Sequence, residues 1–158
     1  MTPDIEELLA KAEAKRKQLL FMIDKIVATE EMMDEDGYPT PHLLWVVEHW
    51  PYQDDGKFME FLKQFWYHAW WGWKSSEEDH PYRQGRKVIK YRISTAGWSG
   101  NESLIAAFER NSTLWWKLWE QSRRGGHYIF ELDLHRNDEP ESSQITKVTK
   151  VEETKDGD

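Results

Sequence analysis

The chain has 158 residues, a net charge of −8 and no cysteine, which excludes disulfides, thiolate metal sites and thiol nucleophiles. The acidic balance argues against general nucleic-acid binding, which needs surplus Lys and Arg, and no run reaches the ~18 apolar residues of a membrane span. We expect a cytoplasmic protein with one main domain, because a chain of this length can bury a core.

Residues 3–28 are predicted to form a long amphipathic helix. Apolar residues recur at helical spacing from Ile5 to Val27, and Pro3 with Asp4 suits a helix start. Such a helix is roughly 37 Å long at 1.5 Å per residue, which is more than a small domain would cover. Residues 1–30 are therefore expected to form an N-terminal helix that either packs on its own domain or pairs with another copy of the chain. Its length favours the second alternative, a homo-oligomer.

Aromatic helices are expected in the next part of the chain. An acidic linker at residues 29–41 leads to a short helix at 42–50 and a second helix at 54–73, which carries aromatic rings on more than one face. The Trp-rich end of the second helix is expected in the core or at a subunit interface, because so many exposed rings would promote aggregation. A polar loop is expected at residues 75–85.

Strands and helices follow in the second half of the chain. Strands are predicted at residues 86–95 and 127–134, and helices at 101–110 and 112–122 lie between them. The fold class is therefore α+β: a helix-rich protein with a small antiparallel sheet packed against aromatic helices.

The domain organisation follows from a change in composition near residue 136. Residues 31–135 are expected to form a single α+β domain whose motif-bearing core is 86–131. Residues 136–158 are polar and acidic, which predicts a disordered tail, although 144–151 alternate as a weak edge strand would.

The two predicted strands should bring two distant loops together. Two helices of about ten residues joined by a tight bend reverse the chain, so we expect the strands to pair antiparallel and side by side. Residues 94–102 and 122–127 would then meet at one edge of the sheet. We expect them to enclose one polar pocket.

The first loop supplies most of the residues expected to bind a ligand, which are Thr95, Gly97, Trp98, Ser99, Gly100, Asn101 and Glu102. A glycine loop before a helix offers free amides and a favourable dipole to an anion. Ser99 and Glu102 also match a capping box, which accounts for both without a ligand. Capping does not account for Trp98, whose ring we expect to stack on the ligand.

The second loop adds Arg123, Arg124, Gly126 and His127 to the expected site. Adjacent guanidinium groups can hold phosphate or carboxylate through paired hydrogen bonds, and an imidazole can donate, accept or titrate. As an alternative, Gly125 ends the preceding helix and both arginines favour the negative end of its dipole. That alternative leaves Gly126 and His127 unexplained.

Both loops resemble the motifs of an uncharacterised family of small bacteriophage proteins. Its members carry Ser-Thr-x-Gly-Trp-Ser-Gly-Asn-Glu after a strand and Ser-Arg-Arg-Gly-Gly-His-Tyr after an aromatic helix, here residues 94–102 and 122–128. The resemblance covers residues 86–131, with Phe108, Asn111, Trp116 and Trp119 between the motifs. It implies a viral protein that acts in an infected bacterial cell, and it implies no particular activity.

Three functions are compatible with these residues. The first is binding of a small anionic ligand, with a nucleotide expected, which in a phage protein would suit sequestration of a host immune signal. The second is inhibition of a host defence complex through an acidic, aromatic surface. The third is an enzyme acting on a phosphorylated substrate, with Glu102 and His127 as base and acid.

We expect the first of these functions. The spacings of metal centres, of serine nucleophiles and of phosphate-binding lysine loops are missing from the chain. The histidines at 42, 49, 68 and 80 also lack the spacing of metal ligands. We therefore predict no catalytic residue, no metal and no cofactor, and we expect as partners a small anionic ligand and, in the alternative, a host defence protein.

Overall fold

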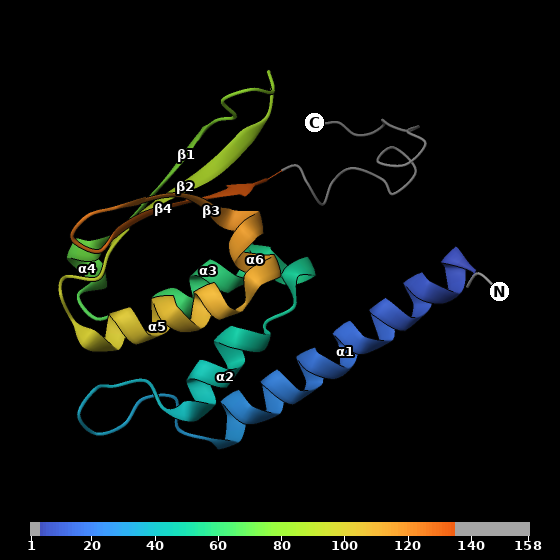
Figure 1. Cartoon of the computed structure of the whole chain (residues 1–158), viewed down its shortest axis with the longest axis horizontal. Coiled ribbons are helices and arrows are strands. Elements are labelled where there is room, and N and C mark those ends of the chain that lie inside the picture. Colours follow the sequence, from blue (N-terminus) through green and yellow to red (C-terminus); the bar gives the residue numbers. More distant parts are fainter. Residues whose placement is uncertain (1–3, 135–158) are drawn as a thin grey trace.

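The computed structural model describes residues 4–134, which form an α+β fold (Figure 1). The helices are α1 (Ile5–Thr29), α2 (Pro41–His49), the short 3-10 helix η1 (Tyr52–Asp54), α3 (Asp55–Lys63), α4 (Ala69–Gly72), α5 (Ser99–Arg110) and α6 (Ser112–Leu118). The strands are β1 (Trp73–Asp79), β2 (Lys87–Ser94), β3 (Trp119–Arg123) and β4 (His127–Asp133). The predicted fold class and long N-terminal helix are confirmed.

The strands form one antiparallel sheet in the order β1-β2-β4-β3. Its two central strands are the two that alternation predicted, and Tyr91 lies opposite Phe130 across them. Helices α3, α5 and α6 cover one face of the sheet, α2 lies beyond them, and α1 runs past α2 and out of the body (Figure 1). Of the helices in residues 4–134, none of α1, α2, α3, α5 and α6 lies on the other face of the sheet, which we call the outer face (Figure 1).

An aromatic core fills the space between the sheet and the helices. The ring of Phe108 on α5 lies 4.8 Å from Phe58, 4.8 Å from Trp115 and 5.0 Å from Phe130, measured between ring centroids. Rings at these distances add a favourable quadrupole interaction to the burial of apolar area. Burial in this core also raises the pKa of the Tyr91 phenol to about 12, so the phenol is neutral at physiological pH.

The single helix predicted over residues 54–73 is wrong. The chain forms η1 and α3, turns at residues 64–68, and begins again as the short α4. The interruption has a tertiary cause, because the buried Asn101 side chain takes up both backbone groups of Tyr67. Those groups would otherwise bond along a helix, and His68 adopts a left-handed φ of 60° directly afterwards.

Two further predictions are wrong at the edges of the sheet. Residues 75–79 belong to β1 instead of a loop, and the helix predicted to reach Ser122 ends at Leu118, where β3 begins. Both edge strands are exposed along most of their length. A strand of this kind is held by backbone hydrogen bonds to its neighbour and needs no apolar alternation, so periodicity does not reveal it.

The N-terminal helix is joined to the body by an ion pair. Arg16 donates from Nε and Nη2 to both carboxylate oxygens of Asp54 at 2.8 Å, and this contact is the main cause of a raised pKa for Arg16.

The predicted disordered tail and its weak strand lie outside the described residues. Within residues 4–134, no helix combines the length and the apolar character needed to cross a bilayer.

Candidate ligand pocket on the outer face of the sheet

The two predicted loops do meet. Ser94 at the end of β2 lies opposite His127 at the start of β4, and the Thr95 amide donates to the Gly126 carbonyl at 3.0 Å. Beyond this contact the two loops face different sides of the molecule. The residues expected to share one pocket are therefore divided between the interior, the helical side and the outer face of the sheet.

Asn101 lies in the interior, where it joins three segments. Its Oδ1 accepts from the Tyr67 amide at 2.9 Å, and its Nδ2 donates to the Tyr67 carbonyl at 3.0 Å and to the Thr95 carbonyl at 3.2 Å. Both Asn101 and Thr95 are only 1% exposed. Both amide hydrogens and the carbonyl oxygen of the Asn101 side chain therefore have protein partners, and the buried side chain is not available to a ligand.

Trp98 is also used by the protein itself. Its half-buried ring stacks on Tyr38 with centroids 4.8 Å apart and contacts Tyr67 at 4.9 Å. The indole lies so close to the buried Gly100 that a Cβ there would overlap its Nε1. Trp98 is not among the residues that line the ligand pocket on the outer face of the sheet, so the stacking of its ring on a ligand stays a prediction.

The predicted capping box at Ser99 is wrong. Helix α5 begins at Ser99, two residues before the predicted start at 101: Trp98 is its N-cap, and no side chain caps it. The Ser99 hydroxyl instead donates to the Tyr38 hydroxyl at 3.4 Å, and Glu102 is exposed in the first turn. Gly97 is exposed with φ of 70°, in the turn that leads into the helix.

The second loop is the turn of a β-hairpin and not the end of a helix. Arg123 and His127 form the last pair of β3 and β4, and residues 124–126 connect them. Gly125 and Gly126 have φ of 90° and 80°, a region that L side chains rarely adopt. The alternative in which Gly125 ends a helix is therefore wrong, although it correctly places a left-handed residue at this position.

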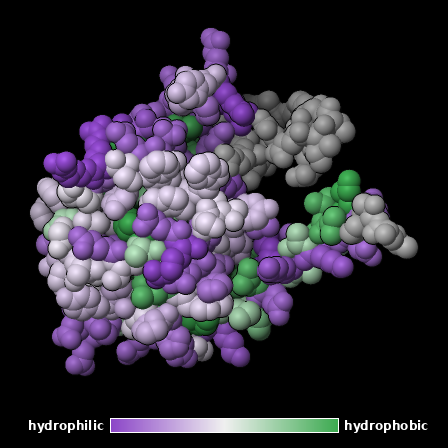
Figure 2. Space-filling model, in the orientation of Figure 1, coloured by the Kyte–Doolittle hydropathy of each residue, from purple (hydrophilic) through white to green (hydrophobic). Residues whose placement is uncertain are grey.

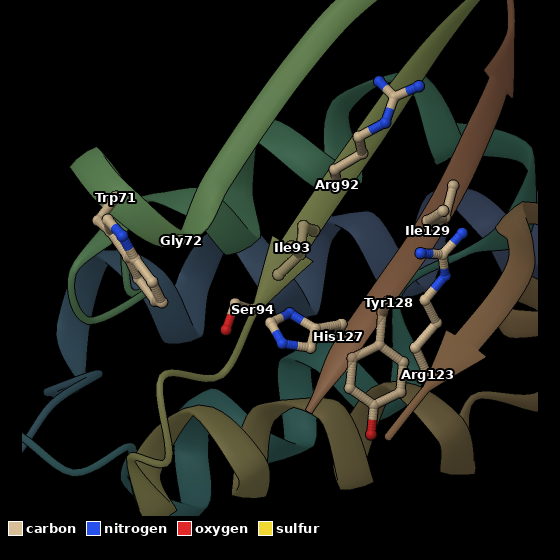
Figure 3. A pocket seen from close by; sticks show the side chains of 9 residues that line it. All are labelled: Trp71, Gly72, Arg92, Ile93, Ser94, Arg123, His127, Tyr128 and Ile129. Atoms are coloured by element: carbon tan, nitrogen blue, oxygen red, sulfur yellow. The ribbon is translucent and has the colours of Figure 1, made fainter. Parts of the chain in front are cut away.

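A pocket of about 520 Å³ opens on the outer face of the sheet. Its lining residues are Trp71, Gly72, Arg92, Ile93, Ser94, Arg123, His127, Tyr128 and Ile129. Figure 3 shows Trp71 on one side of this hollow and Arg123 on the other, with His127 between them. The arrangement follows from strand pairing, because Arg92 faces Ile129 and Arg123 faces His127 on neighbouring strands.

The two arginines of the pocket differ in how they are neutralised. Arg92 donates to Glu78 Oε2 at 3.0 Å and to Ser76 Oγ at 3.4 Å. The Ser76 hydroxyl first, and then Arg92, lower the pKa of Glu78, so this carboxylate is ionised at neutral pH. Arg123 is exposed, and its side chain forms no hydrogen bond or ion pair with any other residue in the range 4–134, although its backbone pairs with that of His127. Its guanidinium is the uncompensated charge of the pocket.

The position of Trp71 at the rim of the pocket follows from close packing of α4 against the end of β2. The Ser94 carbonyl accepts from the indole of Trp66 at 3.0 Å, and a Cβ on Gly72 would lie only 2.8 Å from the same carbonyl oxygen. Helix α4 can therefore approach the end of β2 only with glycine at this position. The Trp71 side chain, which is 51% exposed, follows at the edge of the hollow.

Of the predicted site, the pocket contains Arg123 and His127, while Arg124 is exposed in the turn outside it. The sequence analysis did not include Trp71 or Arg92 in the expected site, although both line the pocket. The alternation of β2 could have indicated Arg92, which lies two residues before Ser94 and so on the same face. No local signal indicates Trp71, because its position depends on the broken helix.

Comparison with known protein families, with curated proteins and with solved structures finds no match to this chain. Across residues 4–134, no group of three or more metal-ligating side chains is placed to hold a metal ion. The function must therefore be argued from the shape and charge of the pocket itself.

Replacing Gly126 by Ala is expected to destabilise the protein more than replacing Gly125. Both glycines have positive φ, which costs an L residue ~1–2 kcal/mol, but only a Cβ at 126 would overlap Thr95 Oγ1. A Cβ at 125 meets only the His127 ring, at 3.5 Å. The midpoint of thermal unfolding, followed by circular dichroism, measures the difference.

A double variant provides the control for this prediction. Thr95 Oγ1 is buried without a hydrogen-bond partner among the described residues, so removing it in Thr95→Ala should cost little. Gly126→Ala combined with Thr95→Ala should then regain part of the lost stability. Equal losses in the two glycine variants, or no recovery in the double variant, would contradict the proposed overlap.

Proposed function

We propose that this chain binds a small anionic ligand, in particular a nucleotide, in the pocket on the outer face of the sheet. The observation that carries the proposal is Arg123, an arginine without an ionic partner among residues 4–134, at the edge of a hollow that is also lined by His127 and Trp71. A guanidinium in this setting is suited to paired hydrogen bonds with phosphate or carboxylate oxygens.

The size and lining of the pocket support a nucleotide. Its volume of about 520 Å³ lies within the range of roughly 300–1,000 Å³ that is typical of small-molecule sites. The exposed ring of Trp71 offers a face for a base, and stacking of this kind contributes ~1–3 kcal/mol per base. Arg123 and Trp71 lie on opposite sides of the hollow, as a phosphate and a base would require (Figure 3).

The arrangement favours binding over catalysis. Glu102, the predicted general base, lies on α5 outside the pocket that contains His127. In this interpretation the protein holds its ligand without changing it. Together with the resemblance to phage proteins, retention without turnover suits the sequestration of a nucleotide signal used in host immunity.

Arg123→Ala is expected to weaken nucleotide binding at least tenfold, because charge-assisted hydrogen bonds contribute about 1.5–3 kcal/mol. Arg124→Ala is a closely matched control, since it removes the same charge from the adjacent exposed residue outside the pocket. It should change the affinity by about twofold or less. Isothermal titration calorimetry across a nucleotide panel measures both. No binding by the wild-type chain, or equal losses in the two variants, would refute the proposed site.

Trp71→Ala is expected to separate recognition of the base from recognition of the phosphate. It should weaken nucleotide binding roughly 5- to 150-fold, in line with the loss of one stacked base. Binding of inorganic pyrophosphate, which has no base, should change little. Trp116→Ala removes an equally large and still more exposed ring, 80% against 51%, and serves as the control. Equal losses for both ligands would mean that Trp71 has no stacking role.

Glu78→Gln is expected to strengthen binding. The Glu78 carboxylate neutralises Arg92, and its replacement by an amide leaves Arg92 free to attract the anion. The gain should be about two- to fivefold, the range expected for an exposed ion pair. Glu77→Gln removes the same charge from the neighbouring position, which faces the other side of β1, and should have less effect. Unchanged affinity in Glu78→Gln would exclude Arg92 from the site.

A further inference from the structure

The N-terminal part of α1 projects from the body as an arm. Residues 5–11 are all exposed, and the first ion pair between α1 and the body is made by Arg16 with Asp54. The projecting part is ~10 Å long at 1.5 Å per residue. Figure 1 shows this end of α1 well clear of the sheet and of the other helices.

The arm carries an apolar stripe that nothing in the described chain covers. Ile5, Leu8 and Leu9 are 70%, 48% and 55% exposed. They continue the stripe that packs on the body, because Ile5 and the buried Ile23 are five helical turns apart and so share a face. Figure 2 shows hydrophobic residues at the tip of the projecting arm. Two turns of helix without packing contacts have only marginal stability in water. We therefore expect a partner to cover the apolar stripe.

The charges along the arm indicate which partner fits. Asp4, Glu6 and Glu7 make the first turn acidic, and Lys11, Lys15 and Lys17 make the following turns basic. In an antiparallel pair of such arms, the acidic turn of each faces the basic turns of the other. A parallel pair would set like charges side by side.

Several of these charged side chains are available for ion pairs with a partner arm. Glu6, Glu7, Lys11 and Lys15 form no ion pair within residues 4–134, whereas Arg16 is already engaged by Asp54. A groove of about 420 Å³ also continues the stripe into the body, between α1 and the end of α2. Its apolar lining includes Ala12, Leu19, Trp50, Pro51 and Tyr52. A partner helix that reaches this groove would find apolar side chains to cover.

We propose that the occupant is a second copy of this chain, paired antiparallel through the arms of α1. Each copy then covers the Ile5, Leu8 and Leu9 stripe of the other and places its acidic first turn beside the other's lysines. The surface lies away from the outer face of the sheet and includes none of the residues of the ligand pocket. The proposed dimer is therefore independent of the proposed ligand binding.

The role of the apolar stripe in dimer formation is tested by measuring the oligomeric state of the chain. Sedimentation velocity over a range of concentrations should show a dimer for the wild-type chain and a monomer for the double variant Leu8→Glu with Leu9→Glu. The dimer dissociation constant should rise roughly 100-fold or more. Phe21→Glu is the matched control, because Phe21 is 68% exposed on the opposite face of α1 and should leave the dimer intact. Circular dichroism establishes that the variants are folded.

The antiparallel orientation is tested by exchanging charges. Glu6→Lys with Glu7→Lys should weaken the dimer, because basic turns then face each other. Adding Lys11→Glu and Lys15→Glu in the same chain should restore the dimer, since acidic and basic turns again lie opposite. A monomeric wild-type chain, a dimer that survives in the leucine variant, or failure of the four-residue exchange to restore pairing would overturn the proposal.

Discussion

The antiparallel pairing of β2 with β4 determines where every candidate ligand group lies. It places the ends of two strands, Ser94 and His127, side by side, and the bond from the Thr95 amide to the Gly126 carbonyl extends the contact into both loops. Because side chains alternate along each strand, the same pairing sends Tyr91 and Phe130 into the core and Arg92 and His127 to the outer face. The core and the pocket therefore lie on opposite faces of the same pair of strands.

Asn101 performs a second joining role on the helical side of the sheet. One amide group satisfies both backbone groups of Tyr67 and the carbonyl of Thr95, so it fixes the turn after β2 to the break between α3 and α4. Trp98 packs against Tyr67 in the same region. Two residues of the motif that follows β2, Asn101 and Trp98, therefore hold segments of the fold together, and this internal role accounts for both without a ligand.

Sequence patterns predicted the features that are encoded locally. The alternation of Tyr91 with Ile93 and the helical spacing of α1 come from burial of one face, and both elements were found where expected. The edge strands could not be found in this way, because polar residues of β1 such as Ser75 and Ser76 satisfy their backbone by pairing alone. The pocket was found only in part, since Trp71 reaches it through an interruption of the helix that depends on distant Asn101.

The exposed, charged edge strands have a consequence for aggregation. Among residues 4–134, no strand pairs with the outer edge of β1 or of β3, so both edges of the sheet have backbone groups to which an incoming strand could add. Residues Lys74, Glu77 and Asp79 line one of these borders, and Glu120 and Arg123 line the other. An approaching strand would have to bury these charges, which is costly. A chain with ten tryptophans is thus protected against cross-β stacking at the positions where a sheet is most vulnerable.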